Sequence, residues 1–139
     1  MKGSHIDGSI LTAVKAVQFG DFQTVKSLID SHQVSANAVD NDGCSLLHWA
    51  AINNRVEIAV LLIRSGAIVP CAGGVLAESP LHWAVRRNYC RVVNLLLSEG
   101  ADVAYRSNMG LDALCLACHL GKCICHTVSN FFVTIVGQV

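Results

Sequence analysis

The sequence lacks an excess of charge of either sign. Its 139 residues include 10 Lys and Arg and 10 Asp and Glu, so the formal net charge is zero. Proteins that bind phosphate backbones carry a basic surplus, and we therefore expect no nucleic-acid partner. Charged residues make up only 14% of the chain and apolar residues 53%, a composition that argues against a disordered tail. The length fits one ordinary domain and excludes a large two-domain enzyme.

Long apolar runs and prolines are scarce as well. The run from Ile58 to Ile63 is one of the longest, and it is far shorter than the roughly 20 apolar residues that a membrane-spanning helix needs. No basic segment followed by an apolar core and a cleavage site is evident near the N-terminus, so we expect no signal peptide. We expect no direct membrane insertion by this chain. Its 7 cysteines, an odd number, are interpreted as reduced thiols in a cytosol-facing protein.

The main positive feature of the sequence is an internal repeat. Leu47-His48-Trp49-Ala50 returns 34 residues later as Leu81-His82-Trp83-Ala84, and Gly66-Ala67 returns after the same interval as Gly100-Ala101. A related segment, Leu114-Cys115-Leu116-Ala117, follows 33 residues after the second copy. This period predicts an all-α solenoid of about four helix-turn-helix units, each packed on its neighbours. We place the units at about residues 9–41, 42–75, 76–108 and 109–128.

Each unit carries signals for a first, inner helix and a second, outer helix. Ser45 precedes the inner helix of the second unit, and Ser79-Pro80 precedes that of the third. Serine is a preferred N-cap residue, and proline is tolerated at the first helical position. Asn54 and Asn88 stand where these helices should end, because asparagine tolerates the left-handed conformation found there. Gly66 is expected to end an outer helix.

A period of about 33 residues with a Ser-Pro-Leu-His start and a Gly-Ala end resembles the ankyrin repeat. Asp40-Asn41-Asp42-Gly43 is similar to the hairpin turn of that family. The resemblance covers about residues 9–128 and implies a scaffold that binds other proteins rather than a catalytic pocket. The first unit lacks the turn and the Leu-His pair, so we interpret it as an N-terminal cap.

The resemblance weakens in the fourth unit. Cys115 occupies the position where the family has histidine, and after His126 the pattern gives way to the apolar residues 129–139. A polar closing helix would be expected where the last repeat faces water. We therefore expect residues 129–139 to be an apolar tail, or an atypical or truncated repeat, of a chain cut from a longer solenoid.

The two central units are similar to one group of ankyrin proteins. Trp49 and Trp83 in consecutive repeats, the Asn53-Asn54-Arg55 end of an inner helix and the Gly73-Gly74 linker together resemble the N-terminal ankyrin domain of DHHC-type palmitoyltransferases, of which the huntingtin-interacting palmitoyltransferases are the best known. This similarity spans about residues 43–85. No Asp-His-His-Cys occurs in the chain. We therefore expect this chain alone to lack enzymatic activity and to need no cofactor, while the resemblance implies a parent protein-cysteine S-palmitoyltransferase.

The same resemblance implies a partner and a site. In that family the ankyrin domain recruits substrates and adaptors by binding a short unstructured motif in which β-branched residues are followed by Gln-Pro. The family positions correspond to Asn53, whose amide can bond to an extended backbone, and Trp83, whose indole is a platform for a proline ring. Arg87, grouped with Arg86 and Arg91, is expected to attract an acidic stretch near the motif. The resemblance also implies a location on the cytosolic face of endomembranes, such as the Golgi.

Structural interpretations of these residues stay open. Trp49 and Trp83 occupy a position that holds leucine in most ankyrin repeats, so either ring could pack between units, and we expect this of Trp49. Asn53 could be solvated at a helix end, and the arginines could lie on a solvated outer face. His48 and His82 are expected to bridge backbones between repeats, as the structural histidines of the family do.

Two further functions remain as alternatives. One is a stand-alone ankyrin adaptor with another protein partner. The other is a zinc or redox-responsive module, because a tetrahedral zinc site needs four thiolate or imidazole ligands and the chain offers Cys115, Cys118, His119, Cys123, Cys125 and His126. Against a metal, Cys115 and Cys118 occupy positions that normally point into the stack, where small buried thiols fit. We therefore predict no metal ligands.

Overall fold

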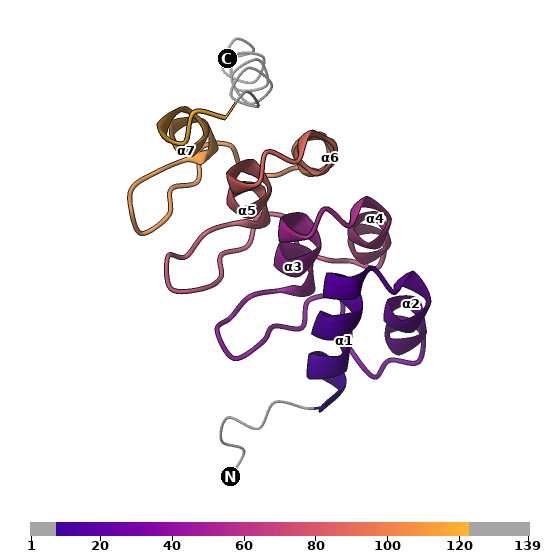
Figure 1. Ribbon diagram of the computed structural model, residues 1–139. Helices are drawn as coiled ribbons and strands as arrows, with labels where there is room; N and C mark the ends of the chain where they lie inside the picture. Colours follow the sequence, from indigo (N-terminus) through magenta and orange to yellow (C-terminus); the bar gives the residue numbers. More distant parts are fainter. Residues whose placement is uncertain (1–7, 123–139) are drawn as a thin grey trace.

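Seven α-helices follow one another in a regular stack (Figure 1). The computed structural model describes residues 8–122. The inner helices are α1 (Gly8–Phe19), α3 (Leu46–Ile52), α5 (Pro80–Arg86) and α7 (Ala113–His119), and the outer helices are α2 (Phe22–Asp30), α4 (Val56–Arg64) and α6 (Cys90–Ser98). Helix α3 packs against both α1 and α5, and α5 packs in turn against α7. The predicted all-α solenoid of helical repeats is confirmed.

The ends of the inner helices follow local sequence chemistry. The side chains of Ser45 and Ser79 each accept a hydrogen bond from the backbone N–H three residues later, and the histidine at that position closes a capping box. Pro80 is the first residue of α5. Asn54 and Asn88 follow α3 and α5 with φ angles of 58° and 60°, which confirms the predicted left-handed helix ends.

Hairpin turns lead into α3, α5 and α7 and project from one side of the stack (Figure 1). In the first hairpin the Asp40 N–H donates to the Cys44 carbonyl at 3.0 Å, and the Gly43 N–H donates to the Asp40 carbonyl at 3.0 Å. This confirms the turn predicted at residues 40–43. The β pairings in residues 8–122 are two isolated antiparallel bridges, Val39 with Ser45 and Gly73 with Glu78.

Consecutive hairpins approach one another through their backbones. The Gly74 N–H donates to the Asp42 carbonyl at 3.0 Å. A Cβ atom on Gly73 would lie 2.7 Å from the Gly43 carbonyl oxygen and 3.0 Å from the Cys44 Cα. Such a short distance leaves room for glycine alone, and the Gly73-Gly74 pair therefore sets the spacing between the first and second hairpins.

A hydrophobic core runs along the stack between the inner and outer helices. Ala50, Ala84 and Ala117 recur at one position of three inner helices and are completely buried, because a small side chain allows close packing there. No helix within residues 8–122 combines the length and the apolar character that crossing a membrane requires. The largest fully buried apolar side chains are Leu46, Leu47, Ile58, Leu62, Leu81, Leu96 and Leu116.

The fourth unit contributes α7 to the described part of the chain. The prediction that Cys115 and Cys118 are buried is wrong, because both thiols are exposed. The inner helices of the second and third units are covered by the hairpin of the unit that follows, whereas no further unit covers α7 within residues 8–122. The predictions for Cys123, Cys125, His126 and the tail at 129–139 lie outside the described residues.

Candidate functional site

The two predicted tryptophans meet where the second unit packs on the third. The rings of Trp49 and Trp83 lie edge to face, with centroids 5.5 Å apart and planes at 87°. The Trp83 ring also contacts the His48 ring, at 5.0 Å and 70°. The Trp49 indole N–H donates to the Asp40 carboxylate at 2.9 Å. Both tryptophans are half-buried against the core, so Trp83 is a ring fixed on two sides with part of its surface open.

His48 and His82 connect successive units. Nε2 of His48 lies 2.8 Å from the Glu78 carbonyl oxygen, and Nε2 of His82 lies 2.8 Å from the Leu111 carbonyl oxygen. Nδ1 of His48 accepts the Ser45 N–H at 3.1 Å, so the ring proton is on Nε2, which donates to the carbonyl. Burial lowers the pKa of His48. A proton added to Nδ1 would also face the Ser45 N–H, so the neutral ring is the form that fits.

Asn53 forms the C-terminal end of α3. Its side-chain Nδ2 donates to the Trp49 carbonyl at 2.8 Å, and the residue is half-buried. This bond orients the amide, and within residues 8–122 no hydrogen bond engages its side-chain oxygen. Because Trp49 also contacts the Trp83 ring, the structure joins the two residues singled out from the sequence, Asn53 and Trp83, through a third.

The predicted basic group divides into paired and unpaired arginines. Nε of Arg86 lies 3.1 and 3.0 Å from the two carboxylate oxygens of Glu78, and Nη2 adds a further contact. Glu78 is buried, with 4% of its surface exposed, so Arg86 is not the free charge that the sequence suggested. Arg87, at the end of α5, and Arg91, in α6, are exposed, and neither forms an ion pair within residues 8–122.

The hairpin tips carry apolar side chains that the sequence analysis did not single out. Val75 is 88% exposed and Met109 is 64% exposed. The Asn108 side-chain amide donates to the Val75 carbonyl at 3.1 Å, and the Tyr105 hydroxyl donates to the Ala77 carbonyl at 2.6 Å. These bonds hold two hairpins side by side. The signal in the sequence was only their common distance from the Leu-His segments.

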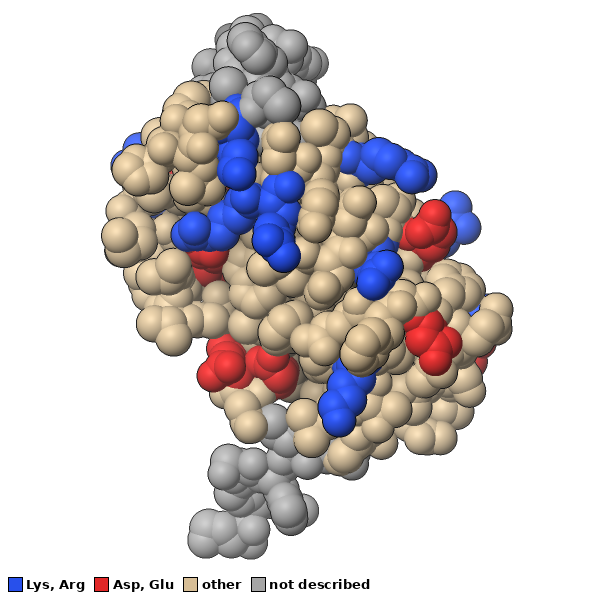
Figure 2. Space-filling model, in the orientation of Figure 1, with Lys and Arg blue, Asp and Glu red and all other residues tan. Residues whose placement is uncertain are grey.

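Charge is distributed unevenly over the surface. Figure 2 shows Lys and Arg side chains gathered over the region of α5 and α7, and acidic side chains over the hairpin that precedes α3. This hairpin contains Asp40 and Asp42, whereas Arg87 ends α5 and Lys122 follows α7. The molecule therefore has separate acidic and basic areas, although its formal net charge is zero.

The chemistry of the described residues is that of binding. No group of three or more His, Cys, Asp or Glu in residues 8–122 is arranged to hold a metal ion. Burial, with the charges of Asp40 and Asp42, raises the pKa of the Cys44 thiol to about 11. Burial also raises the pKa of Cys71. Both thiols stay protonated at neutral pH, which leaves them poor nucleophiles.

This fold and this surface define a class of protein, a helical-repeat scaffold that presents one rigid face to other proteins. The family described as ankyrin repeats (3 copies) matches residues 13–107, more than half of the chain. The chain belongs to the ankyrin-repeat family, whose repeats form protein-interaction modules.

The resemblance to the ankyrin region of DHHC-type palmitoyltransferases is confirmed. The chain is 41% identical to Palmitoyltransferase ZDHHC13 of Mus musculus over 75 residues, which cover 54% of this chain and 12% of that protein. It is 42% identical to Palmitoyltransferase ZDHHC17 of Danio rerio over 79 residues, with coverages of 56% and 13%. It is also 42% identical to Palmitoyltransferase akr1 of Schizosaccharomyces pombe over 65 residues, with coverages of 47% and 10%. The likeness therefore concerns a small part of each relative.

Proposed function

We propose that this chain is the cytosolic ankyrin domain that recruits substrates and adaptors to a membrane-bound protein S-palmitoyltransferase. Its ligand is a short extended peptide in which β-branched residues are followed by Gln-Pro. The parent protein lies on endomembranes such as the Golgi, with this domain on the cytosolic side and the transferase centre elsewhere. The chain itself binds the peptide and does not acylate it.

The half-exposed ring of Trp83 is the observation that carries this proposal. His48 and Trp49 hold the ring edge-on from two sides, so little conformational freedom remains to be lost when a ligand binds. The open part of the indole offers an apolar platform to a proline ring or a branched side chain. The likeness to palmitoyltransferases over about half of the chain supports the choice of parent protein.

Asn53 supplies the polar part of the surface. Its Nδ2 is held by the Trp49 carbonyl, and its side-chain oxygen is available to accept a peptide N–H. Asn53 and Trp83 lie on consecutive inner helices and share Trp49 as a neighbour, so they contact different parts of one extended peptide. Arg87, exposed at the end of α5, favours an acidic residue beside the motif, with a modest gain in affinity and a faster association.

Titration of a fluorescent peptide containing Val-Ile-x-x-Gln-Pro into the 139-residue chain tests this proposal. We expect Trp83→Ala and Asn53→Ala each to weaken binding about tenfold or more, as the loss of a central anchor does. Replacing Gln-Pro by Ala-Ala in the peptide should weaken its binding to the parent chain by a similar factor.

Two matched variants control for general effects of truncation. Phe19, an aromatic residue of α1, is 80% exposed, and Asn94 is exposed on the outer helix α6. Phe19→Ala and Asn94→Ala should bind the peptide as the parent does. If Trp83→Ala and Asn53→Ala also bind normally, the site is wrong, and if the parent binds no Gln-Pro peptide, the alternative of an ankyrin adaptor with another partner is favoured.

A further inference from the structure

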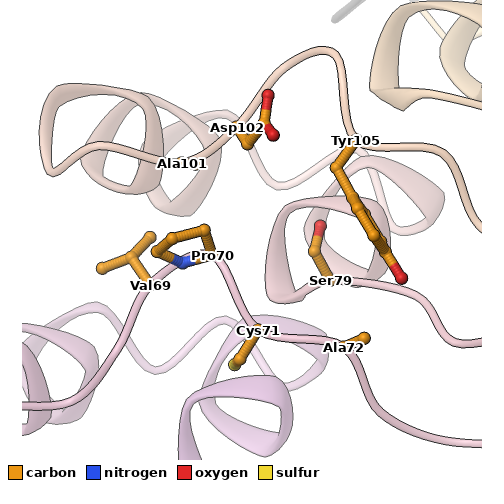
Figure 3. Close-up of a pocket in the computed structure, with 8 residues that line it drawn as sticks. All are labelled: Val69, Pro70, Cys71, Ala72, Ser79, Ala101, Asp102 and Tyr105. Carbon is orange, nitrogen blue, oxygen red and sulfur yellow. The ribbon is translucent and has the colours of Figure 1, made fainter.

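A cavity lies between the two segments that lead into the hairpins before α5 and α7 (Figure 3). Its volume is about 210 Å³. Val69 and Pro70 line one side, and Ala101, Asp102 and Tyr105 line the other. Neither Asn53 nor Trp83 belongs to the lining, so this is a separate place on the molecule from the surface described above.

The walls of the cavity are apolar and fixed. Val69 and Ala101 are buried side chains of the core, and the ring of Pro70 adds a rigid apolar surface. The ring of Tyr105 is held at both ends, because its hydroxyl donates to the Ala77 carbonyl at 2.6 Å and the ring lies edge to face with His82 at 5.9 Å. An apolar cavity of about 150 Å³ is enough to hold benzene. This cavity therefore has room for one long side chain.

A single carboxylate stands at the edge of this apolar space. Oδ1 of Asp102 accepts the Ala104 N–H at 2.9 Å, which fixes the orientation of the group. No hydrogen bond engages the second carboxylate oxygen within residues 8–122, and Asp102 is exposed. Figure 3 shows the carboxylate directed away from the apolar walls, at the margin of the cavity. No Lys or Arg lines the cavity, so the charge at its edge is uncompensated there.

We propose that this cavity binds an arginine side chain of a protein partner. The methylene stem packs against Val69, Ala101 and the Tyr105 ring, and the guanidinium pairs with Asp102 at the edge, as long cationic side chains do when the stem is buried and the head stays in water. Arginine fits better than lysine because its planar, weakly hydrated head stacks on an aromatic ring and offers two parallel N–H donors to a carboxylate. A purely apolar side chain would leave Asp102 unused.

An NMR titration of the full chain with N-acetyl-arginine methylamide tests the proposal. The neutral, nearly isosteric citrulline analogue serves as the comparison probe. We expect the shifted amide signals to centre on Asp102, Ala104 and Tyr105, and the arginine analogue to bind about threefold to fivefold more tightly than the citrulline analogue, the range of one exposed ion pair. Raising the salt concentration should remove most of this difference.

Asp102→Asn isolates the charge. The amide oxygen of asparagine can still accept the Ala104 N–H, so the turn is kept while the negative charge is lost. This variant should bind the arginine analogue only as tightly as the parent binds the citrulline analogue. Glu57→Gln, which removes an exposed charge outside the cavity, should bind both probes as the parent does.

Three results would overturn the proposal. They are equal affinities for the arginine and citrulline analogues, unchanged binding of the arginine analogue to Asp102→Asn, and shifts centred on Asp40 and Asp42 instead of the cavity. Equally tight binding of N-acetyl-norleucine methylamide would also overturn it and assign the cavity to an apolar side chain. The Gln-Pro peptide should bind Asp102→Asn normally, so this test is independent of the one for Trp83.

Discussion

Individual polar side chains join the units of this protein. His48 closes the capping box of its own helix and donates to the Glu78 carbonyl of the next unit. Glu78 in turn pairs its backbone with Gly73 and its carboxylate with Arg86. Each of these residues is buried or nearly so, and a buried polar group left without its partner destabilises a protein by about 1–3 kcal/mol. The contacts between units therefore depend on a few side chains that each make several hydrogen bonds.

We predict that the free energy of unfolding falls as the pH is lowered from 7.5 to 5.5. The pKa of His48 in the folded chain lies below its ordinary value of 6.5 because of burial, so the unfolded chain takes up the proton first. The contribution of His48 is complete above about pH 6.5 and is lost as the pH falls toward the folded pKa, at up to about 1.4 kcal/mol per pH unit. Urea unfolding at several pH values measures this slope.

His48→Gln is the matched variant for the pH experiment. It should be less stable than the parent at pH 7.5, because the bridge to the Glu78 carbonyl is altered, and its stability should change less between pH 7.5 and 5.5. A parent chain of constant stability over this range, or a variant with the same slope as the parent, would contradict the role assigned to the neutral His48 ring.

At the scale of elements, short inner helices are combined with hairpins that lie against one another. The helices α3, α5 and α7 have 7 residues each, and isolated helices of this length are unstable in water. Their stability comes from the core and from the hairpin that precedes each of them. The close approach of Gly73 to Gly43 and Cys44 therefore affects the position of the whole third unit.

Gly73→Ala tests this hairpin contact. The added methyl group would lie 2.7 Å from the Gly43 carbonyl oxygen and 3.1 Å from Cε1 of His48, so a backbone segment has to shift. We expect a loss of about 1–3 kcal/mol in the free energy of unfolding, the range for overpacking, measured by urea denaturation. Gly8→Ala in α1, where nothing lies within 4 Å, should stay within about 0.5 kcal/mol of the parent. Equal stabilities of the two variants would refute the assigned contact.

For the molecule as a whole, each unit is stabilised by the units next to it. Helices α3 and α5 pack between two inner helices, whereas within residues 8–122 the inner helices α1 and α7 each have one such neighbour. In a solenoid of this kind the stability is close to a sum of unit and interface contributions. Local opening should therefore be most frequent at the ends of the stack.

Native-state amide hydrogen exchange measures this gradient along the chain. We predict that the slowest amides of α5 exchange about tenfold or more slowly than the slowest amides of α7, because opening α5 breaks two interfaces between inner helices and opening α7 breaks one within the described residues. Equal protection of α7 and α5 would show that the chain unfolds as a single cooperative unit.

Much of the fold was predictable because its signals are local and repeated. The 34-residue interval between the two Leu-His-Trp-Ala segments, the serine caps and the asparagine helix ends all depend on a few neighbouring residues, and the structure contains each of them. For the candidate site, the sequence identified Trp83 and Asn53 through a family resemblance. It did not show that Trp49 connects them or that Arg86 is paired with Glu78.

The sequence by itself determined the repeat, the class of fold and the residues that begin and end the inner helices, since these follow from hydrogen bonding within one turn of chain. Only the tertiary structure decided which side chains are covered. It left Cys115 and Cys118 exposed, buried Glu78 beside Arg86, and enclosed a cavity next to Asp102. Burial depends on segments about 30 residues apart that meet when the units stack, and no local pattern of residues records that contact.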